Sequence, residues 1–137
     1  MNIDHVVLWV DNPTKSLDFY VDIVGLRPVR RQDFEEGTAS FPSVRLNEST
    51  ILDLMNREML STVQEFTGGS NAGGAPINHV CFSMNAQDYS ALRARLIAQE
   101  IELTSGGEHA FGAQGLAESS EYFSDPDGNV IEIRHYQ

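Results

Sequence analysis

Cysteine and basic residues are both scarce in this chain of 137 residues. The single cysteine, Cys81, excludes a disulfide within the chain and is typical of a protein from a reducing compartment. Nine Lys and Arg stand against 20 Asp and Glu, for a net charge of −11, so the phosphates of a nucleic acid would be repelled. No apolar stretch approaches the roughly 20 residues that cross a bilayer, and residues 1–4 lack the basic region of a signal peptide. We therefore expect a cytoplasmic protein with neither nucleic acid nor a membrane as its partner.

The balance of residue types is that of a folded globular domain. Hydrophobic residues make up 41% of the chain and charged residues 21%, and a chain of this length can bury a core without disulfides. The apolar run at 79–82 predicts that Cys81 is a small buried core residue rather than a reactive thiol. One compact domain is expected over residues 1–137.

An internal repeat divides this domain into two halves. The segment Ile77-Asn78-His79-Val80-Cys81 matches Ile3-Asp4-His5-Val6-Val7 almost position for position, and both are strand-like in composition. A helix is predicted after each segment, over residues 13–24 and 88–99, because apolar residues recur there at spacings of three and four. Further strands are predicted at 26–32, 38–46 and 50–56 in the first half and at 102–104, 118–123 and 129–135 in the second.

This pattern predicts an α+β fold made of two βαβββ modules. The modules cover about residues 1–66 and 77–137, and a short helix at 57–66 ends the first. The glycine-rich segment 67–76 has neither the spacing nor the lysine of a phosphate-binding loop. We interpret it as a flexible connector between the modules.

Alternation of side chains along a strand assigns one face of each sheet to helix packing and the other to polar residues. In each half, the polar face begins with a histidine, His5 or His79, and ends with a carboxylate, Asp53 or Glu132. A carboxylate in a partly apolar site is costly unless it is paired, hydrogen-bonded or coordinated, and one divalent cation would satisfy all these groups together. Two imidazoles and one carboxylate form a facial triad that binds Fe²⁺, Mn²⁺, Ni²⁺ or Zn²⁺ and leaves positions open for a substrate.

The repeat decides between a metal ligand and an ordinary strand histidine. Taken alone, His5 would more often be a satisfied core or surface residue than a ligand. Because His79 occupies the equivalent position and Glu132 ends the same half, we predict that His5, His79 and Glu132 hold one divalent metal ion. The shorter side chain of Asp53 leaves two roles open for this residue, a fourth ligand or a spectator.

These residues resemble the vicinal oxygen chelate superfamily, which includes glyoxalase I, fosfomycin-resistance proteins, bleomycin-resistance proteins and extradiol dioxygenases. The resemblance rests on the two repeated segments, on Ser16-Leu17-Asp18-Phe19-Tyr20 with Gly25-Leu26, and on Tyr122-Phe123-Ser124-Asp125-Pro126-Asp127-Gly128-Asn129-Val130-Ile131-Glu132. It implies that the modules form an open half-barrel sheet and that His5, His79 and Glu132 occupy the family's metal positions. A metal held there would bind two neighbouring oxygens of a small substrate, with Tyr122 and Asp53 as catalytic candidates.

Several residues differ from those of individual family members, and these differences help to rank the reactions that the resemblance allows. Trp9 stands where glyoxalase I has an arginine, and Asp53 stands where it has glutamate or glutamine. Ser119 does not match the arginine of the fosfomycin-resistance proteins. Extradiol dioxygenases share Tyr122, although the histidine that they place before this tyrosine is matched here only by the more distant His109. We therefore expect dioxygenase-like chemistry ahead of a glyoxalase-type isomerase or lyase, with a drug-sequestering resistance protein as the non-catalytic alternative.

Apolar and aromatic residues are expected around the substrate. Trp9, Met55 and Phe111, together with Tyr122, are the predicted walls of a pocket for a small organic molecule. A homodimer is expected as well, because an open half-barrel leaves strand edges and apolar surface that a two-fold partner covers.

Overall fold

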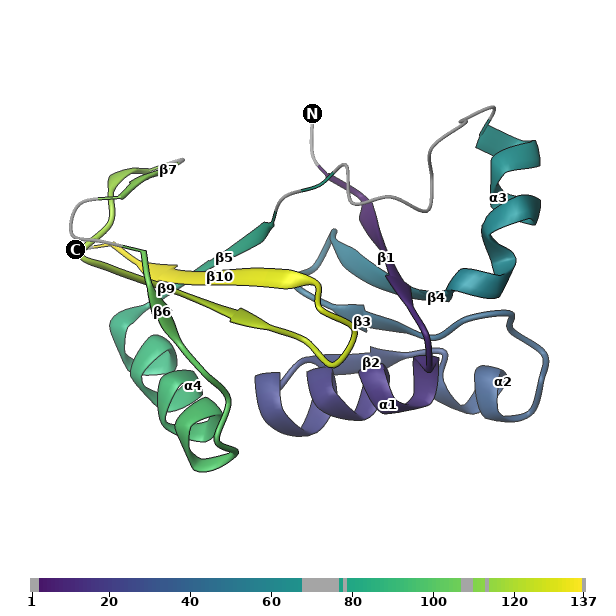
Figure 1. Cartoon of the computed structure of the whole chain (residues 1–137), viewed down its shortest axis with the longest axis horizontal. Helices are drawn as coiled ribbons and strands as arrows, with labels where there is room; N and C mark the ends of the chain where they lie inside the picture. The colour runs from purple at the N-terminus through teal and green to yellow at the C-terminus, as the bar shows by residue number, and fades with distance from the viewer. Residues whose placement is uncertain (1–2, 68–76, 78, 107–109, 113, 137) are drawn as a thin grey trace. The chain divides into compact units, whose positions relative to one another are not determined.

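The chain separates into two units, Met1–Pro76 and Ile77–Gln137, in the computed structural model. The structure describes residues 3–67, 77, 79–106, 110–112 and 114–136. Each unit contains a four-stranded sheet. Figure 1 shows α1 (Pro13–Asp18), α2 (Arg31–Glu35) and α3 (Leu60–Thr67) in the first unit and α4 (Ala86–Ala98) in the second. Except for Thr67, the predicted connector at 67–76 lies outside the described residues.

The sheet of the first unit has the strand order β1-β4-β3-β2. These strands are β1 (His5–Val10), β2 (Arg27–Val29), β3 (Ser43–Arg45) and β4 (Ile51–Asn56). The pair β1 and β4 is parallel, whereas β4 with β3 and β3 with β2 are antiparallel. The first strand of the unit is thus hydrogen-bonded to its last strand.

The helix after β1 begins and ends where the sequence predicts. It consists of α1 (Pro13–Asp18) and a π-helical continuation, η1 (Phe19–Val24). The side chain of Asn12 accepts a hydrogen bond from the Lys15 amide and caps the start, with Pro13 in the first turn. Gly25 ends the helix at a φ of 88°, a conformation that side chains with a Cβ disfavour. Its core-facing residues are buried, as are Leu52 and Leu54 on β4.

Two predicted strands of this unit are shorter than expected, and the first of them, predicted at 26–32, pairs only as β2 (Arg27–Val29). The segment 38–46 was predicted to be extended, but only β3 pairs within it, and a helix, α2 (Arg31–Glu35), precedes it. The carbonyl of Asp33 accepts hydrogen bonds from the amides of Thr38 and Ala39 and so closes a turn in place of a strand. The short helix predicted at 57–66 is confirmed as η2 (Arg57–Met59) followed by α3 (Leu60–Thr67).

The second unit repeats the same topology. Its sheet has the order β5-β10-β9-β6, again with the first and last strands parallel. The strands are β5 (Val80–Met84), β6 (Thr104–Ser105), β9 (Ser119–Ser124) and β10 (Val130–His135). The predicted repeat of two βαβββ modules is therefore confirmed as an α+β fold with two open sheets.

One helix covers one face of this second sheet. Helix α4 (Ala86–Ala98) starts two residues earlier than predicted, because Asn85 caps it by accepting from the Asp88 amide. It buries Tyr89, Leu92 and Leu96 as the spacing predicts, and it packs against β10, where Ile131 and Ile133 are also buried. Because α4 covers this face, the polar face of the sheet is the opposite one.

Two turns shape the second unit near its polar face. A hairpin of β7 (Phe111–Gly112) and β8 (Gly115–Leu116), which the sequence did not predict, lies between β6 and β9 in the chain. The turn between β9 and β10 is built on Asp125, whose side chain accepts hydrogen bonds from the amides of Asp127 and Asn129. Gly128 supplies a φ of 81° there. This second turn sets the register with which β10 returns along β9.

Within the described part of the chain, no helix combines the length and the apolar character that crossing a membrane requires.

Candidate functional site

Glu132 lies in the middle of β10 and is 1% exposed. Its register partners are Cys81 on β5 and Tyr122 on β9, so these three side chains form a row across one face of the sheet. The neighbours of Glu132 in sequence, Ile131 and Ile133, are buried on the other face. Glu132 therefore lies on the face opposite α4, as strand alternation predicts.

His79 and Arg134 both contact the carboxylate of Glu132. Nε2 of His79 lies 3.1 Å from Oε2. Arg134, two residues further along β10, donates from Nε to Oε1 at 3.1 Å and from Nη2 to the same oxygen. The structure thus brings together His79 and Glu132, two of the predicted ligands, and adds a buried arginine beside them.

Arg134 is the residue that the metal prediction overlooked. Alternation along β10 places it on the face of Glu132, so the signal was present in the sequence. A buried carboxylate is satisfied by pairing, by hydrogen bonds or by coordination, and coordination to a divalent ion was the predicted means at Glu132. In the structure, the guanidinium already supplies one positive charge at hydrogen-bonding distance.

Tyr122 contacts the ring of His79 edge to face, with 5.4 Å between the ring centroids. Burial raises the pKa of the Tyr122 hydroxyl above its ordinary value of 10.0, and the nearby carboxylate of Glu132 raises it further. The hydroxyl is therefore protonated at neutral pH and is able to donate a hydrogen bond or a proton from a position next to two predicted ligands.

Cys81 is exposed, and the prediction that it belongs to the core was wrong. Its position in β5 opposite Glu132 directs the side chain to the polar face and not toward α4. Partial burial and the charge of Glu132 raise the pKa of the thiol to about 11. The thiol is therefore protonated at neutral pH, which disfavours its use as a nucleophile.

In the first unit, Asp53 occupies the position equivalent to Glu132. It lies in β4, is 6% exposed, and its Oδ1 accepts a hydrogen bond of 2.6 Å from the hydroxyl of Ser43 on β3. Nη2 of Arg30 lies 3.3 Å from the same hydroxyl oxygen and donates to it. Asp53 is thus hydrogen-bonded through a hydroxyl, whereas the residue two positions after it, Met55, is apolar.

His5 begins β1 on the polar face of the first unit. Its Nδ1 lies 2.9 Å from Oδ1 of Asp4. This hydrogen bond raises the pKa of His5 above its ordinary value of 6.5; burial opposes the rise, and the charges of Asp53 and Asp4 add to it. A carboxylate on one ring nitrogen is the arrangement in which the other nitrogen, Nε2, binds a metal.

The residues predicted to line the substrate pocket belong to different units of the chain. Trp9 and Met55 are register partners on β1 and β4 in the first unit, and Met55 is buried. Phe111 lies on the β7–β8 hairpin of the second unit and is 82% exposed. His109 lies outside the described residues.

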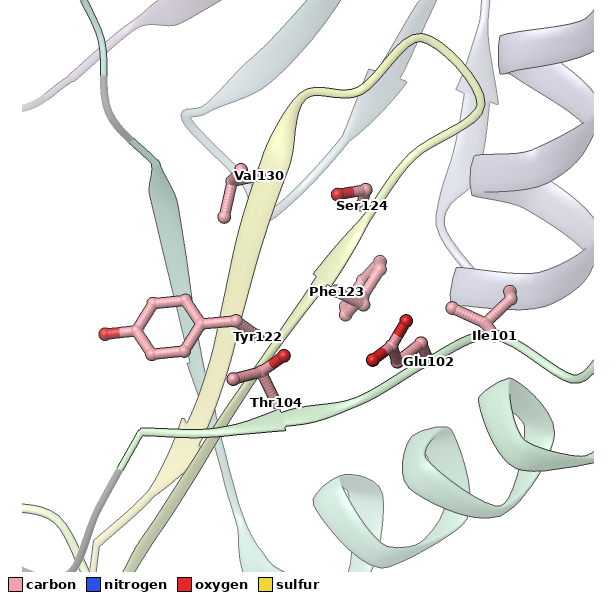
Figure 2. Close-up of a pocket in the computed structure, with 7 residues that line it drawn as sticks. All are labelled: Ile101, Glu102, Thr104, Tyr122, Phe123, Ser124 and Val130. Atoms are coloured by element: carbon pink, nitrogen blue, oxygen red, sulfur yellow. The ribbon is translucent and has the colours of Figure 1, made fainter.

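A pocket of about 390 Å³ lies in the second unit next to Tyr122 (Figure 2). Its walls are Ile101, Glu102, Thr104, Tyr122, Phe123, Ser124 and Val130. The strand register places Thr104, Ser124 and Val130 on the same face as Tyr122 and Glu132. Glu102 is the charged residue among these walls, so the pocket carries negative charge and no basic group from its own lining. The pocket thus adjoins the row that contains Glu132.

His79 and Glu132 would suit a divalent metal, and His5, the third predicted ligand, lies in the other unit. Two ligand atoms that each bind one cation at about 2.1 Å and at right angles are about 3 Å apart. The 3.1 Å between His79 Nε2 and Glu132 Oε2 matches this separation. Among the residues that the structure describes, no group of three or more His, Cys, Asp or Glu is gathered closely enough to hold a metal ion. His5 belongs to the first unit and His79 and Glu132 to the second.

Comparison with known proteins gives the family to which the chain belongs. A lactoylglutathione lyase from Pseudomonas aeruginosa is 26% identical to the chain, over 95% of the chain and 80% of the relative. The solved structure of a virulence protein from Salmonella typhimurium matches with a TM-score of 0.75 and 24% identity, over 100% of this chain and 98% of that one. TnmS3, an antibiotic binding protein from Streptomyces, matches with a TM-score of 0.67 and 19% identity, over 100% and 97% of the two chains. The family model described as "Glyoxalase/Bleomycin resistance protein/Dioxygenase superfamily" matches residues 2–133. The chain therefore belongs to the glyoxalase, bleomycin resistance protein and dioxygenase superfamily.

Proposed function

We propose that this protein is a divalent-metal-dependent enzyme that acts on a small organic substrate with neighbouring oxygen atoms. The observation that carries the proposal is the approach of His79 Nε2 to Glu132 Oε2 at 3.1 Å on the polar face of the second sheet. His5, whose Nδ1 is held by Asp4, is proposed as the third ligand. The metal is proposed to be Fe²⁺, Mn²⁺, Ni²⁺ or Zn²⁺, each of which accepts imidazole and carboxylate ligands.

The protein's own residues have separate parts in this proposal. When bound, the metal would polarise the substrate oxygens and stabilise negative charge on them. Tyr122, protonated and next to His79, is placed to donate a hydrogen bond or a proton to an oxygen of the substrate. Asp53, which is hydrogen-bonded to Ser43, is the second candidate for moving a proton.

Within this class, an isomerase or lyase reaction of the glyoxalase type is proposed ahead of oxygenation. A lactoylglutathione lyase is among the relatives that match over 95% of the chain, and we take this similarity to outweigh the shared tyrosine that favours a dioxygenase. Oxygen uptake separates the two reactions, since a ring-cleaving dioxygenase consumes O₂ and an isomerase or lyase does not.

The negative charge of the pocket next to Tyr122 limits which charge the bound part of the substrate can carry. Its lining contributes the carboxylate of Glu102 and no basic group, and the nearby Arg134 is bound to Glu132. We therefore propose that the part of the substrate that enters this pocket is neutral or cationic. A glutathione conjugate, which carries two carboxylates, would need basic groups from elsewhere.

A second candidate function is that of a small-molecule binding protein that uses no metal. The ion pair between Arg134 and Glu132 favours it, because the guanidinium then neutralises the buried carboxylate without a metal ion. The similarity to an antibiotic binding protein is consistent with this alternative.

Metal analysis decides between these functions. Protein purified without chelator is analysed for bound metal and then titrated with Fe²⁺, Mn²⁺, Ni²⁺ and Zn²⁺ by calorimetry. We expect one ion per site for the parent protein and loss of binding in His79→Ala. The matched control is His135→Gln, since His135 lies on the opposite face of β10, against Tyr89. Absence of binding by the parent would exclude the metal-dependent enzyme and leave the binding protein.

Because the proposed ligands belong to two units, the site is completed either within one chain or between two chains. We propose a homodimer, and mixing two inactive variants identifies the arrangement. If each site takes His5 from one chain and His79 with Glu132 from another, a mixture of His5→Ala and His79→Ala chains contains intact sites. If each chain completes its own site, the mixture contains none. Metal binding by the refolded mixture distinguishes the two outcomes.

A further inference from the structure

The guanidinium of Arg134 is fixed beside Glu132 by contacts on all of its nitrogens. Nε and Nη2 donate to Oε1 of Glu132, while Nη1 donates to the carbonyl of Ala110 at 3.5 Å and to the hydroxyl of Tyr136 at 3.4 Å. Gly112 approaches so closely that a Cβ at this position would overlap Nη1. The hairpin therefore covers Arg134, whose side chain is 7% exposed.

The position of the guanidinium matters because Arg134 binds one of the two oxygens of Glu132. Both hydrogen bonds from Arg134 reach Oε1, whereas Oε2 faces His79. A cation bound between His79 and Oε2 would therefore leave the ion pair formally intact but would share the carboxylate with another positive charge. Two positive charges a few ångströms apart repel each other, and this repulsion is strong where water is excluded.

The equivalent strand of the first unit has no arginine beside its carboxylate. Met55 stands two residues after Asp53, as Arg134 stands two residues after Glu132. Asp53 accepts its hydrogen bond from a neutral hydroxyl. The arginine thus belongs to the half that holds two of the three proposed ligands and is not a general requirement of the module.

We propose that Arg134 is a built-in counter-ion for Glu132, which supplies in the metal-free protein the positive charge that a divalent ion would otherwise provide. The second unit then folds without metal, and the site binds metal more weakly than the same ligands would without the arginine. The statement about metal affinity rests on the proposed function, whereas the statement about folding does not.

The affinity is tested by titrating the full chain with Zn²⁺ at pH 8 in the parent protein, Arg134→Met and Arg134→Lys. We expect Arg134→Met to bind Zn²⁺ at least about tenfold more tightly, because a competing positive charge is removed. Arg134→Lys is the matched control, which keeps the charge, and its affinity should stay close to that of the parent. Equal or weaker binding by Arg134→Met would overturn the proposal. If the parent and both variants bind no Zn²⁺, the proposed enzyme function fails and the folding test below remains.

Folding is tested with EDTA present, by thermal unfolding of Arg134→Met and of the double variant Glu132→Gln/Arg134→Met. The single change leaves the buried carboxylate of Glu132 without its guanidinium partner, although His79 still lies 3.1 Å from Oε2, and should lower the Tm by about 5 °C or more. The double change removes both charges and should recover most of this loss. If Arg134→Met does not fold, the double variant still gives a result: failure of both variants alike would show that packing, and not charge, is what Arg134 supplies.

Discussion

Gly112 lies against the guanidinium of Arg134 so closely that the β7–β8 hairpin leaves no space for one additional carbon atom. The Gly112→Ala change must therefore displace either the hairpin or the arginine. Because the arginine is bound to Glu132, we expect a loss of about 1–3 kcal/mol in the free energy of unfolding. Urea denaturation measures this loss. Phe111→Ala in the same hairpin is the control, since that side chain is 82% exposed and should change stability little; equal effects of the two changes would contradict the close approach.

The hydroxyl of Ser43 is the hydrogen-bond donor to the buried carboxylate of Asp53. Ser43→Ala removes this donor and leaves Oδ1 without it, which should cost about 1–3 kcal/mol of unfolding free energy. Ser40→Ala, at an exposed position in the loop before β3, should cost less than about 0.5 kcal/mol. Chemical denaturation measures the free energy of unfolding of both variants. No loss in Ser43→Ala would show that water replaces the hydroxyl.

Asp4 holds the protonated form of His5. The hydrogen bond between them is the largest cause of the raised pKa of His5, so Asp4→Asn should lower that pKa in the metal-free protein. The stabilisation that this pair contributes is fully present below pH 6.5, the ordinary pKa of histidine, and is lost as the pH rises through the higher folded-state value. Proton NMR titration of His5 measures the pKa directly. An unchanged titration in Asp4→Asn would show that the hydrogen bond is not formed in solution.

Leu96 and Ile97 are neighbours in α4 with opposite surroundings. Leu96 is 0% exposed and Ile97 is 49% exposed. We expect Leu96→Ala to cost about 2–5 kcal/mol of unfolding free energy and Ile97→Ala to cost about 1 kcal/mol or less. Thermal or urea unfolding separates the two. A larger loss for Ile97→Ala would mean that this face of α4 is covered in solution.

Much of the fold was predictable because it depends on local signals that occur twice. The cap at Asn12, the left-handed Gly25 and the spacing of Tyr89, Leu92 and Leu96 all act within one or two turns of helix. Helix α2 was missed because its start at Arg30 has a positive φ with no glycine or capping side chain to signal it. The β7–β8 hairpin was missed because its two-residue strands are too short to show alternation.

The site was predictable in part for the same reason. Strand alternation placed Glu132 and Asp53 on the faces opposite the helices, and both are found there. Residue types alone did not show how each carboxylate is neutralised. The contrast between Arg134 beside Glu132 and Ser43 beside Asp53 depends on which neighbouring side chain reaches the oxygen, and that is decided by three-dimensional packing.

The parallel pairing of the first and last strands within each unit implies an order of events during synthesis on the ribosome. β1 has no strand partner until β4 has left the exit tunnel, and all four strands of the first sheet precede the second unit in the chain. In the same way, β5 can pair with β10 only after every other strand of its sheet has been synthesised. The strands of the first sheet are thus all synthesised while the second sheet is still incomplete, and Glu132 and Arg134, which both lie in β10, belong to the strand that completes the second sheet.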